Sequence, residues 1–228
     1  MYYLIPVAVY SVFFAALSAM FSETAPKLRL ILKSAASLMF VVGGAVFTFC
    51  YASAPSGKYI FAALALGGAG DILLGLHSLI ADKKKHIVPN AAGGLCFLAG
   101  HIVYIVLFLG SAQFNLWLLA SLPLTVIMLF VLKKNLKKPS QNKILIPLAI
   151  YSVALWFMCV SALNMLISVP SAGNVLIFVG AILFAASDYL LAIYNFAAGS
   201  QKKINIFYAV MLCYCIAQWL FVYAVICR

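Results

Sequence analysis

Long apolar runs, separated by short polar segments, restrict the fold of this chain more than any other feature. Of its 228 residues, 67% are hydrophobic and only 8% are charged, whereas soluble domains carry about 25% charged residues. Eight runs are each long enough to cross a hydrocarbon core of about 30 Å as a helix. Because lipid cannot satisfy an open backbone, we predict an all-α, polytopic membrane bundle of eight transmembrane helices. The predicted spans are 2–21, 28–50, 59–80, 89–110, 114–132, 144–167, 173–197 and 204–226.

Lysine and arginine concentrate in alternate connections between these spans. The connections after spans one, three, five and seven, with their flanking positions, hold 13 of the 15 basic residues, and the other side has only Lys58 and Arg228. Since positively charged loops stay in the cytoplasm, both termini are predicted on the non-cytoplasmic side. We expect one integral membrane domain over 1–228, in the inner (cytoplasmic) membrane of a bacterium and in contact with membrane lipids. The net charge of +11 does not indicate nucleic acid, because no basic helix or aromatic-basic stripe is present.

Spans three and seven carry related sequences. GAGDILLG at 68–75 and AASDYLLA at 185–192 place an aspartate in the same pattern, and the two aspartates are 117 residues apart. Thirty residues after them come His101 and Gln218, respectively. The spacing predicts two parallel four-helix repeats, 1–113 and 114–228. The alternative is that two similar segments arose independently.

Asp71 and Asp188 are the two acids inside predicted spans, whereas Glu23 and Asp82 lie in predicted loops. Each is about nine residues, hence about 13 Å, from the cytoplasmic end of its span. An ionisable residue at that depth costs at least about 2.5–3.5 kcal/mol on insertion scales and usually has a function. Two carboxyls in one cavity would leave one protonated and one ionised, which suits a general acid paired with a carboxylate or base. The structural alternative is a pair of neutral aspartic acids that hold helices together.

Further polar side chains are placed where they could line the same site. His101 lies about 18 Å from the cytoplasmic face, and Tyr104 shares its side of the helix. Lys33 is about one turn inside its span, where it could either reach the headgroups or point inward to an anionic substrate group. No metal or other cofactor is expected, because the three histidines lack metal-type spacing. The predicted substrate-binding residues are Lys33, His101, Tyr104, Tyr151, Asn195, Tyr214 and Gln218.

Six short motifs follow one another over most of the chain. They are RLILKS at 29–34, GDxxL at 70–74, FxxGHxxY at 97–104, Yx6M at 151–158, GAxxFxxSD at 180–188 and YxxxQ at 214–218. Each is short, but the ordered set is specific, and it resembles the YhhN or lysoplasmalogenase family of membrane hydrolases. One departure is Ser34, where many bacterial relatives have proline after the lysine.

The resemblance implies an ether hydrolase that cleaves the vinyl ether bond of lysoplasmalogens. Lysoplasmenylcholine or lysoplasmenylethanolamine would give a fatty aldehyde and a glycerophospho-alcohol, with the family's catalytic carboxylates at Asp71 and Asp188. Vinyl ethers hydrolyse through slow proton transfer to carbon and an oxocarbenium ion, so an acid and a carboxylate suit the reaction, as in glycoside hydrolysis. From the residues alone, a proton-coupled transporter of a small or lipid-like substrate is the main alternative. A structural or lipid-sensing membrane protein is another.

Overall fold

The computed structural model describes residues 4–21, 24–51, 55–76, 79–80, 87–112, 115–135, 145–196 and 203–227, and in these ranges the chain is helical without strands. Seven helices are long and apolar enough to cross a membrane, and an eighth apolar helix, α1, has 17 residues. The chain is therefore an integral membrane protein with the all-helical bundle fold that was predicted. The elements are α1 (Leu4–Met20), α2 (Pro26–Val46), the π-helical η1 (Phe47–Tyr51), α3 (Ser56–Leu76), α4 (Ile87–Gly110), the 3₁₀-helical η4 (Leu116–Ala120), α5 (Ser121–Asn135), α6 (Leu145–Ser168), α7 (Ala172–Phe196) and α8 (Lys203–Ala224).

The predicted spans differ from the helices mainly at their ends. Helix α3 ends at Leu76 rather than at residue 80, so Asp71 is five residues from that end rather than about nine. The fifth span opens with the 3₁₀ turn η4 before α5. Pro123, in the first turn of α5, has no amide hydrogen, so it cannot donate the backbone hydrogen bond that would continue a regular α-helix towards the N-terminus. Glu23, Asp82 and most of the loop lysines lie outside the described residues.

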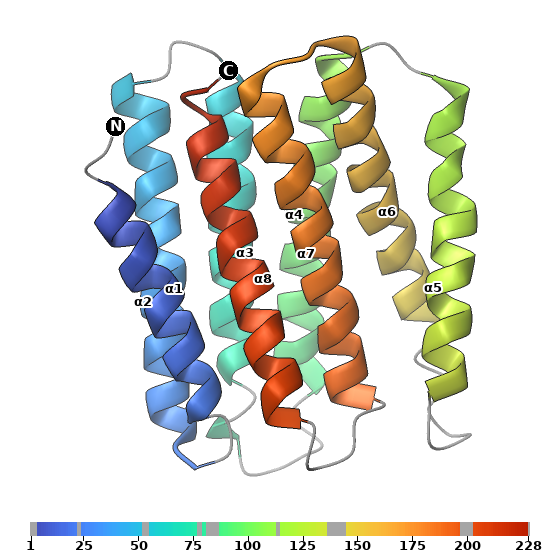
Figure 1. Ribbon diagram of the computed structural model, residues 1–228. Helices are drawn as coiled ribbons and strands as arrows, with labels where there is room; N and C mark the ends of the chain where they lie inside the picture. Colours follow the sequence, from blue (N-terminus) through green and yellow to red (C-terminus); the bar gives the residue numbers. More distant parts are fainter. Residues whose placement is uncertain are drawn as a thin grey trace.

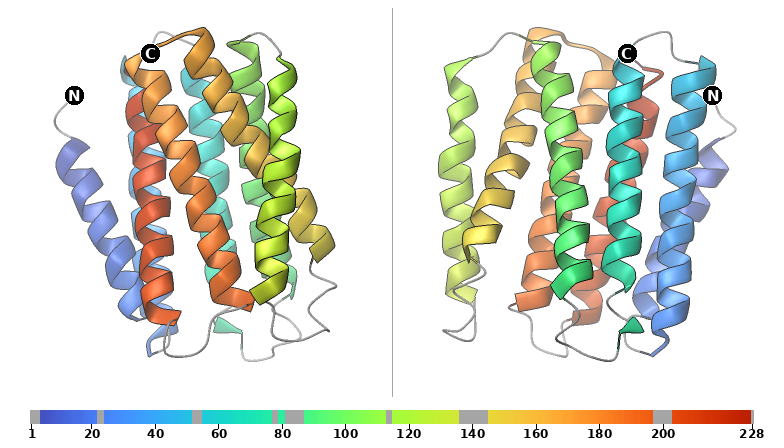
Figure 2. Two further views of the ribbon diagram at one scale, coloured as in Figure 1. Left: turned by 45° about the vertical axis from the view of Figure 1, so that its right-hand side comes forward. Right: turned by 180° about the vertical axis from the view of Figure 1, so that it is seen from behind.

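Six helices form a ring. Each packs on the next in the order α2, α3, α4, α6, α7, α8, and α8 closes the ring on α2 (Figures 1 and 2). The two remaining helices lie outside it, with α1 against α2 and α8, and α5 against α6 and α7. Helices two to four of each predicted repeat thus occupy corresponding places, and the first helix of each repeat is peripheral. The duplication itself stays a prediction.

Both termini lie at the same end of the bundle (Figure 1). The described ends of the helices that the α1–α2, α3–α4, α5–α6 and α7–α8 connections join lie at the opposite end. These are the connections in which the sequence concentrates its lysines, and we refer to this end as the lysine-rich end. The shared side of the termini agrees with an even number of spans, while its assignment to the non-cytoplasmic side stays a prediction from the loop charges.

Small residues bring α3 and α4 into backbone contact beside the first acid. A Cβ atom added to Gly70 would lie 3.2 Å from the carbonyl oxygen of Gly93, and one added to Gly93 would lie 3.1 Å from that of Gly70. Glycine, which has no side chain, lets the two helices pack this closely. The crossing fixes the position of Asp71, the next residue after Gly70.

Candidate active site

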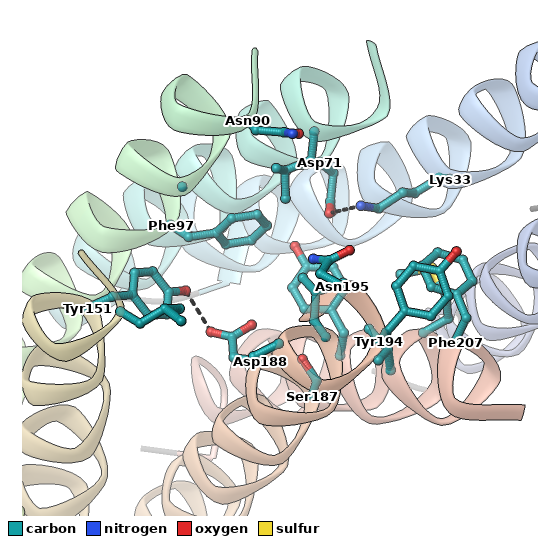
Figure 3. A pocket seen from close by; sticks show the side chains of 18 of the residues that line it. Lys33, Asp71, Asn90, Phe97, Tyr151, Ser187, Asp188, Tyr194, Asn195 and Phe207 are labelled. Carbon is teal, nitrogen blue, oxygen red and sulfur yellow. Dashed lines mark hydrogen bonds and ion pairs between the residues drawn. The ribbon is translucent and has the colours of Figure 1, made fainter. Parts of the chain in front are cut away.

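A cavity of about 530 Å³ lies inside the ring, at the level of the last turns of α3 and α7 and the first turns of α2, α4, α6 and α8. It is therefore in the half of the bundle next to the lysine-rich end. Side chains from α2 to α8 line it, and the two aspartates come from different walls (Figure 3). Six of the nine predicted site residues are in this lining: Lys33, Asp71, Tyr151, Asp188, Asn195 and Tyr214.

The Asp71 carboxyl is held by two side chains of α2. Lys33 Nζ lies 2.9 Å from Asp71 Oδ1, and Ser37 Oγ lies 2.6 Å from Asp71 Oδ2. Lys33 and Ser37 are one turn apart and share a face of the helix. The Ser37 hydroxyl is also 3.0 Å from the Lys33 carbonyl oxygen, so its single hydrogen serves one of these two acceptors at a time. Lys33 thus points inward and gives the buried Asp71 a cationic partner.

The Asp188 carboxyl has neutral or titratable partners instead. Tyr151 Oη donates to Asp188 Oδ2 at 2.6 Å, and His101 Nε2 lies 2.9 Å from Tyr151 Oη and 3.5 Å from Asp188 Oδ2. When Tyr151 donates to Asp188, its oxygen can accept the Nε2 hydrogen of His101, which fixes the histidine tautomer. Helices α4, α6 and α7 therefore join in one chain of hydrogen bonds that ends at Asp188.

The two acids also differ in exposure. The Asp188 side chain is 13% exposed, whereas that of Asp71 is 2% exposed. Of the two carboxyls, Asp188 is therefore the more accessible to a molecule in the cavity, whereas Asp71 lies within its cluster with Lys33 and Ser37.

Three aromatic rings pack together beside the acids, and we call Phe97, Phe184 and Tyr214 the aromatic wall. Their centroids are 5.4–6.1 Å apart in edge-to-face pairs, a favourable arrangement for aromatic groups. His101 packs on Phe184 at 4.9 Å and lies outside the lining of the main cavity. His101 therefore reaches the site through Tyr151 rather than by direct contact with the cavity.

Three predicted binding residues lie away from the lining. They are His101, Tyr104, which stacks on Phe221 with ring centroids 4.4 Å apart, and Gln218. The Tyr104 hydroxyl and Gln218 Oε1 are buried and have no hydrogen-bond partner in the described part of the chain. A role for these three residues in binding substrate stays a prediction.

Gln218 instead packs against α3 at Gly67, one helical turn before Asp71. A Cβ atom at Gly67 would lie 2.9 Å from Gln218 Nε2 and 3.2 Å from Tyr214 Oη. Gly67 is one helical turn before Asp71, so α8 side chains pack tightly over the helix that carries this acid. Glycine at position 67 leaves room for the ends of these two side chains.

Three residues of the site were not singled out from the sequence. Ser37, four residues after Lys33, binds Asp71. Arg29, four residues before Lys33, lines the cavity with its guanidinium carbon 4.4 Å above the centre of the Phe207 ring. The spacing of these polar residues at one-turn intervals on α2 was the available signal. Phe207 offered none, because it is one apolar residue among many.

The described residues contain no group of three or more His, Cys, Asp or Glu side chains that could hold a metal ion. The cavity offers two carboxyls in different surroundings, one beside the amino group of Lys33 and one beside a hydroxyl that can either donate or accept. Such a pair can deliver a proton to a bound molecule and stabilise a positive charge that develops on it.

Comparison with known proteins gives one match. The sequence matches the YhhN family over residues 29–225, which is nearly the whole chain. No curated protein and no solved structure matches it.

Proposed function

Since the chain belongs to the YhhN family, we propose that it hydrolyses the vinyl ether bond of lysoplasmalogens, such as lysoplasmenylcholine or lysoplasmenylethanolamine. The products are a fatty aldehyde and a glycerophospho-alcohol. The observation that carries the proposal is that Asp71 and Asp188 line one cavity and have contrasting partners. The reaction needs such a contrast, because one group must give up a proton while the other stays negative.

Asp188 is the proton donor in this proposal. Its partner, the Tyr151 hydroxyl, can accept from a protonated carboxyl or donate to an ionised one, so both states of Asp188 keep a hydrogen bond. Asp188 is also the more exposed of the two acids. His101, on the far side of Tyr151, is placed to exchange a proton with this pair at 2.9 Å.

Asp71 is the carboxylate in this proposal. The Lys33 ammonium group can only donate, so it favours an acceptor at Asp71 Oδ1. A fixed negative group in a site of low dielectric stabilises a nearby cation far more strongly than it would in water. Asp71 therefore suits the stage at which the substrate carries a positive charge.

The reaction then follows in three steps. Asp188 transfers its proton to the vinyl carbon that is not bonded to the ether oxygen. This leaves an oxocarbenium ion, whose positive charge Asp71 stabilises. A water molecule adds to the cationic carbon and loses a proton to Asp188, which is restored. In the resulting hemiacetal, the bond between the former vinyl carbon and the glycerol oxygen breaks. The proton of the hemiacetal hydroxyl is transferred to the glycerol oxygen, and the aldehyde is released. One water molecule is consumed for each bond cleaved.

The test is aldehyde release by the purified protein in detergent, given lysoplasmenylcholine or lysoplasmenylethanolamine. A lysophospholipid with a saturated ether chain is the matched control, since it has no double bond to protonate. We expect aldehyde from the vinyl ether lipid alone, and the same rate when a chelator is added. Absence of aldehyde, together with substrate-dependent proton flux in liposomes, would contradict hydrolysis and favour a proton-coupled transporter.

A further inference from the structure

Tyr214 of α8 lines the cavity, but its hydroxyl oxygen is buried and has no hydrogen-bond partner in the described part of the chain. The ring makes edge-to-face contacts with Phe40, Phe97 and Phe184, at centroid distances of 5.9, 5.8 and 5.4 Å. These contacts come from three different helices, so they fix the ring and with it the place of the oxygen. A buried hydroxyl without a partner is costly, which makes its surroundings informative.

The Tyr214 hydroxyl lies beside the stretch of α3 that carries the first acid. A Cβ atom at Gly67 would lie 3.2 Å from Tyr214 Oη. Gly67 and Asp71 are four residues apart, so their Cβ positions share a helix face and are about 6 Å from each other. Side chains of a helix lean towards its N-terminus, which directs Asp71 back towards Gly67. The Asp71 carboxyl is therefore the acceptor nearest at hand, and its charge acts on the hydroxyl.

Gln218 follows Tyr214 by one turn on the same face of α8. Its Nε2 would lie 2.9 Å from a Cβ atom at Gly67, so the polar ends of both side chains meet at this glycine. The amide nitrogen of glutamine can donate to the Tyr214 oxygen while the hydroxyl gives its own hydrogen to another group. The three side chains can thus form a series from Gln218 through Tyr214 to Asp71.

Asp71 has the capacity for a third donor. Lys33 occupies Oδ1 and Ser37 occupies Oδ2, whereas an ionised carboxylate offers about four lone-pair sites. The hydrogen of Ser37 is also shared with the Lys33 carbonyl oxygen. A hydroxyl donor favours the ionised carboxyl and adds no positive charge that would oppose a cation on the substrate.

We propose that Tyr214 is a positioning residue for Asp71: its hydroxyl donates to the Asp71 carboxylate, and Gln218 donates to the Tyr214 oxygen. A small rotation of the Asp71 or Tyr214 side chain completes the two bonds. The proposal rests on the proposed function for the role of Asp71, which is to stabilise the substrate cation. Tyr214 and Gln218 act through Asp71 and do not bind the substrate, so α2 and α8 together hold this acid.

The first test is steady-state hydrolysis of lysoplasmenylcholine. Tyr214→Phe keeps the ring and should lower kcat about 10- to 100-fold, the usual worth of a hydrogen bond to a charged group, with KM unchanged. Gln218→Met loses a bond between neutral groups and should lower kcat about 3- to 10-fold, without further effect in Tyr214→Phe. An unchanged kcat in Tyr214→Phe would overturn the proposal.

Tyr223→Phe is the matched control on the same helix. It also removes a tyrosine hydroxyl that has no partner among the described residues, but Tyr223 does not line the cavity. We expect the wild-type kcat in this variant. A loss equal to that of Tyr214→Phe would assign both hydroxyls to general packing of α8 and would overturn the proposal.

A double-mutant cycle shows whether Tyr214 acts through Asp71. In the Asp71→Asn background, Tyr214→Phe should lower kcat much less than in the wild type, because the charge that the hydroxyl supports is gone. The same factor in both backgrounds would overturn the proposal.

The same four proteins, unfolded in mixed micelles without substrate, separate this proposal from the hydrolysis. We expect Tyr214→Phe to shift the unfolding equilibrium at least about fivefold more in the wild type than in the Asp71→Asn background. Such coupling in a protein that releases no aldehyde would overturn the hydrolysis and leave the bond between Tyr214 and Asp71 standing. Aldehyde release by the wild type, without coupling in either cycle, would overturn the bond and leave the hydrolysis standing.

Discussion

Replacement of Tyr151 by phenylalanine removes one oxygen atom at the centre of the proposed proton pathway. That oxygen donates to Asp188 at 2.6 Å and lies 2.9 Å from His101 Nε2. Without it, His101 is 3.5 Å from Asp188, at the outer limit of a hydrogen bond, and its Nδ1 is already without a hydrogen-bond partner in the described part of the chain. The substitution therefore disconnects Asp188 from both neighbours with almost no change in side-chain volume.

The magnitude follows from the kind of bond that is lost. A hydrogen bond to a charged group contributes about 1.5–3 kcal/mol, and each 1.36 kcal/mol is about a factor of ten in rate. If the bond matters mainly while Asp188 becomes ionised during proton transfer, kcat should fall about 10- to 100-fold with little change in KM. Stability should also fall, by about 1–3 kcal/mol, because both nitrogens of the buried His101 ring are then poorly satisfied.

The assay is steady-state aldehyde release by Tyr151→Phe, compared with unfolding followed by tryptophan fluorescence in mixed micelles. Tyr223→Phe is the matched control. It also removes a buried tyrosine hydroxyl, but one that has no hydrogen-bond partner among the described residues and does not line the cavity. We expect Tyr223→Phe to keep the wild-type kcat. A wild-type kcat in Tyr151→Phe, or an equal loss in both variants, would refute the assignment of the pathway.

Two further predictions concern the surroundings of Asp71. Lys33→Met should destabilise the protein by about 3–5 kcal/mol, because it leaves a buried carboxylate unpaired. The double variant with Asp71→Asn should recover much of that loss, and simple additivity in a double-mutant cycle would contradict a coupled pair. Gly70→Ala should cost about 1–3 kcal/mol and lower aldehyde release, since its Cβ would lie 2.8 Å from Phe97 Cε2 and 3.2 Å from the backbone carbonyl oxygen of Gly93. Gly110→Ala is the control, with no atom within 4 Å of the added Cβ, and a similar loss there would contradict the packing argument.

The membrane fold and the two acids were accessible from the sequence for simple physical reasons. Runs of about 20 apolar residues can form little other than transmembrane helices. An acid within such a run is costly enough to stand out, and polar residues at one-turn intervals from it share its helix face. Asn195, seven residues after Asp188, was included as a site residue on this basis, whereas Lys33 and Tyr151 were included as polar residues within apolar spans. All three line the cavity with the acids.

The pairing of side chains across helices could not be read from spacing along the chain. His101 follows Asp71 by the same thirty residues that separate Gln218 from Asp188, which linked each to the acid of its own repeat. In the structure His101 is bonded to Tyr151 beside Asp188, and Gln218 packs over Gly67 beside Asp71. The reason is the ring order, in which α4 packs on α6 and α8 packs on α2, so the fourth helix of each half contacts the other half.

The helix ends and the position of Arg29 at the cavity could not be predicted from the sequence either. A basic residue close to a predicted loop is normally solvated, and only the packing of Phe207 and Tyr194 shows that this one is held at the cavity. Aromatic residues are frequent in every span, so the sequence does not indicate which ring meets which cation.

The central claim, that Asp188 and Asp71 act together on the vinyl ether, is tested most directly by aldehyde release in the isosteric variants Asp188→Asn and Asp71→Asn. Neither asparagine can supply a proton or carry a negative charge. With folding verified by thermal unfolding in detergent, we predict a loss of about 10²–10⁴-fold in kcat for Asp188→Asn, the usual contribution of a general acid. For Asp71→Asn we predict a loss of about 10²–10³-fold, the usual contribution of a preorganised electrostatic group. Release of aldehyde at close to the wild-type rate by either folded variant would contradict the claim.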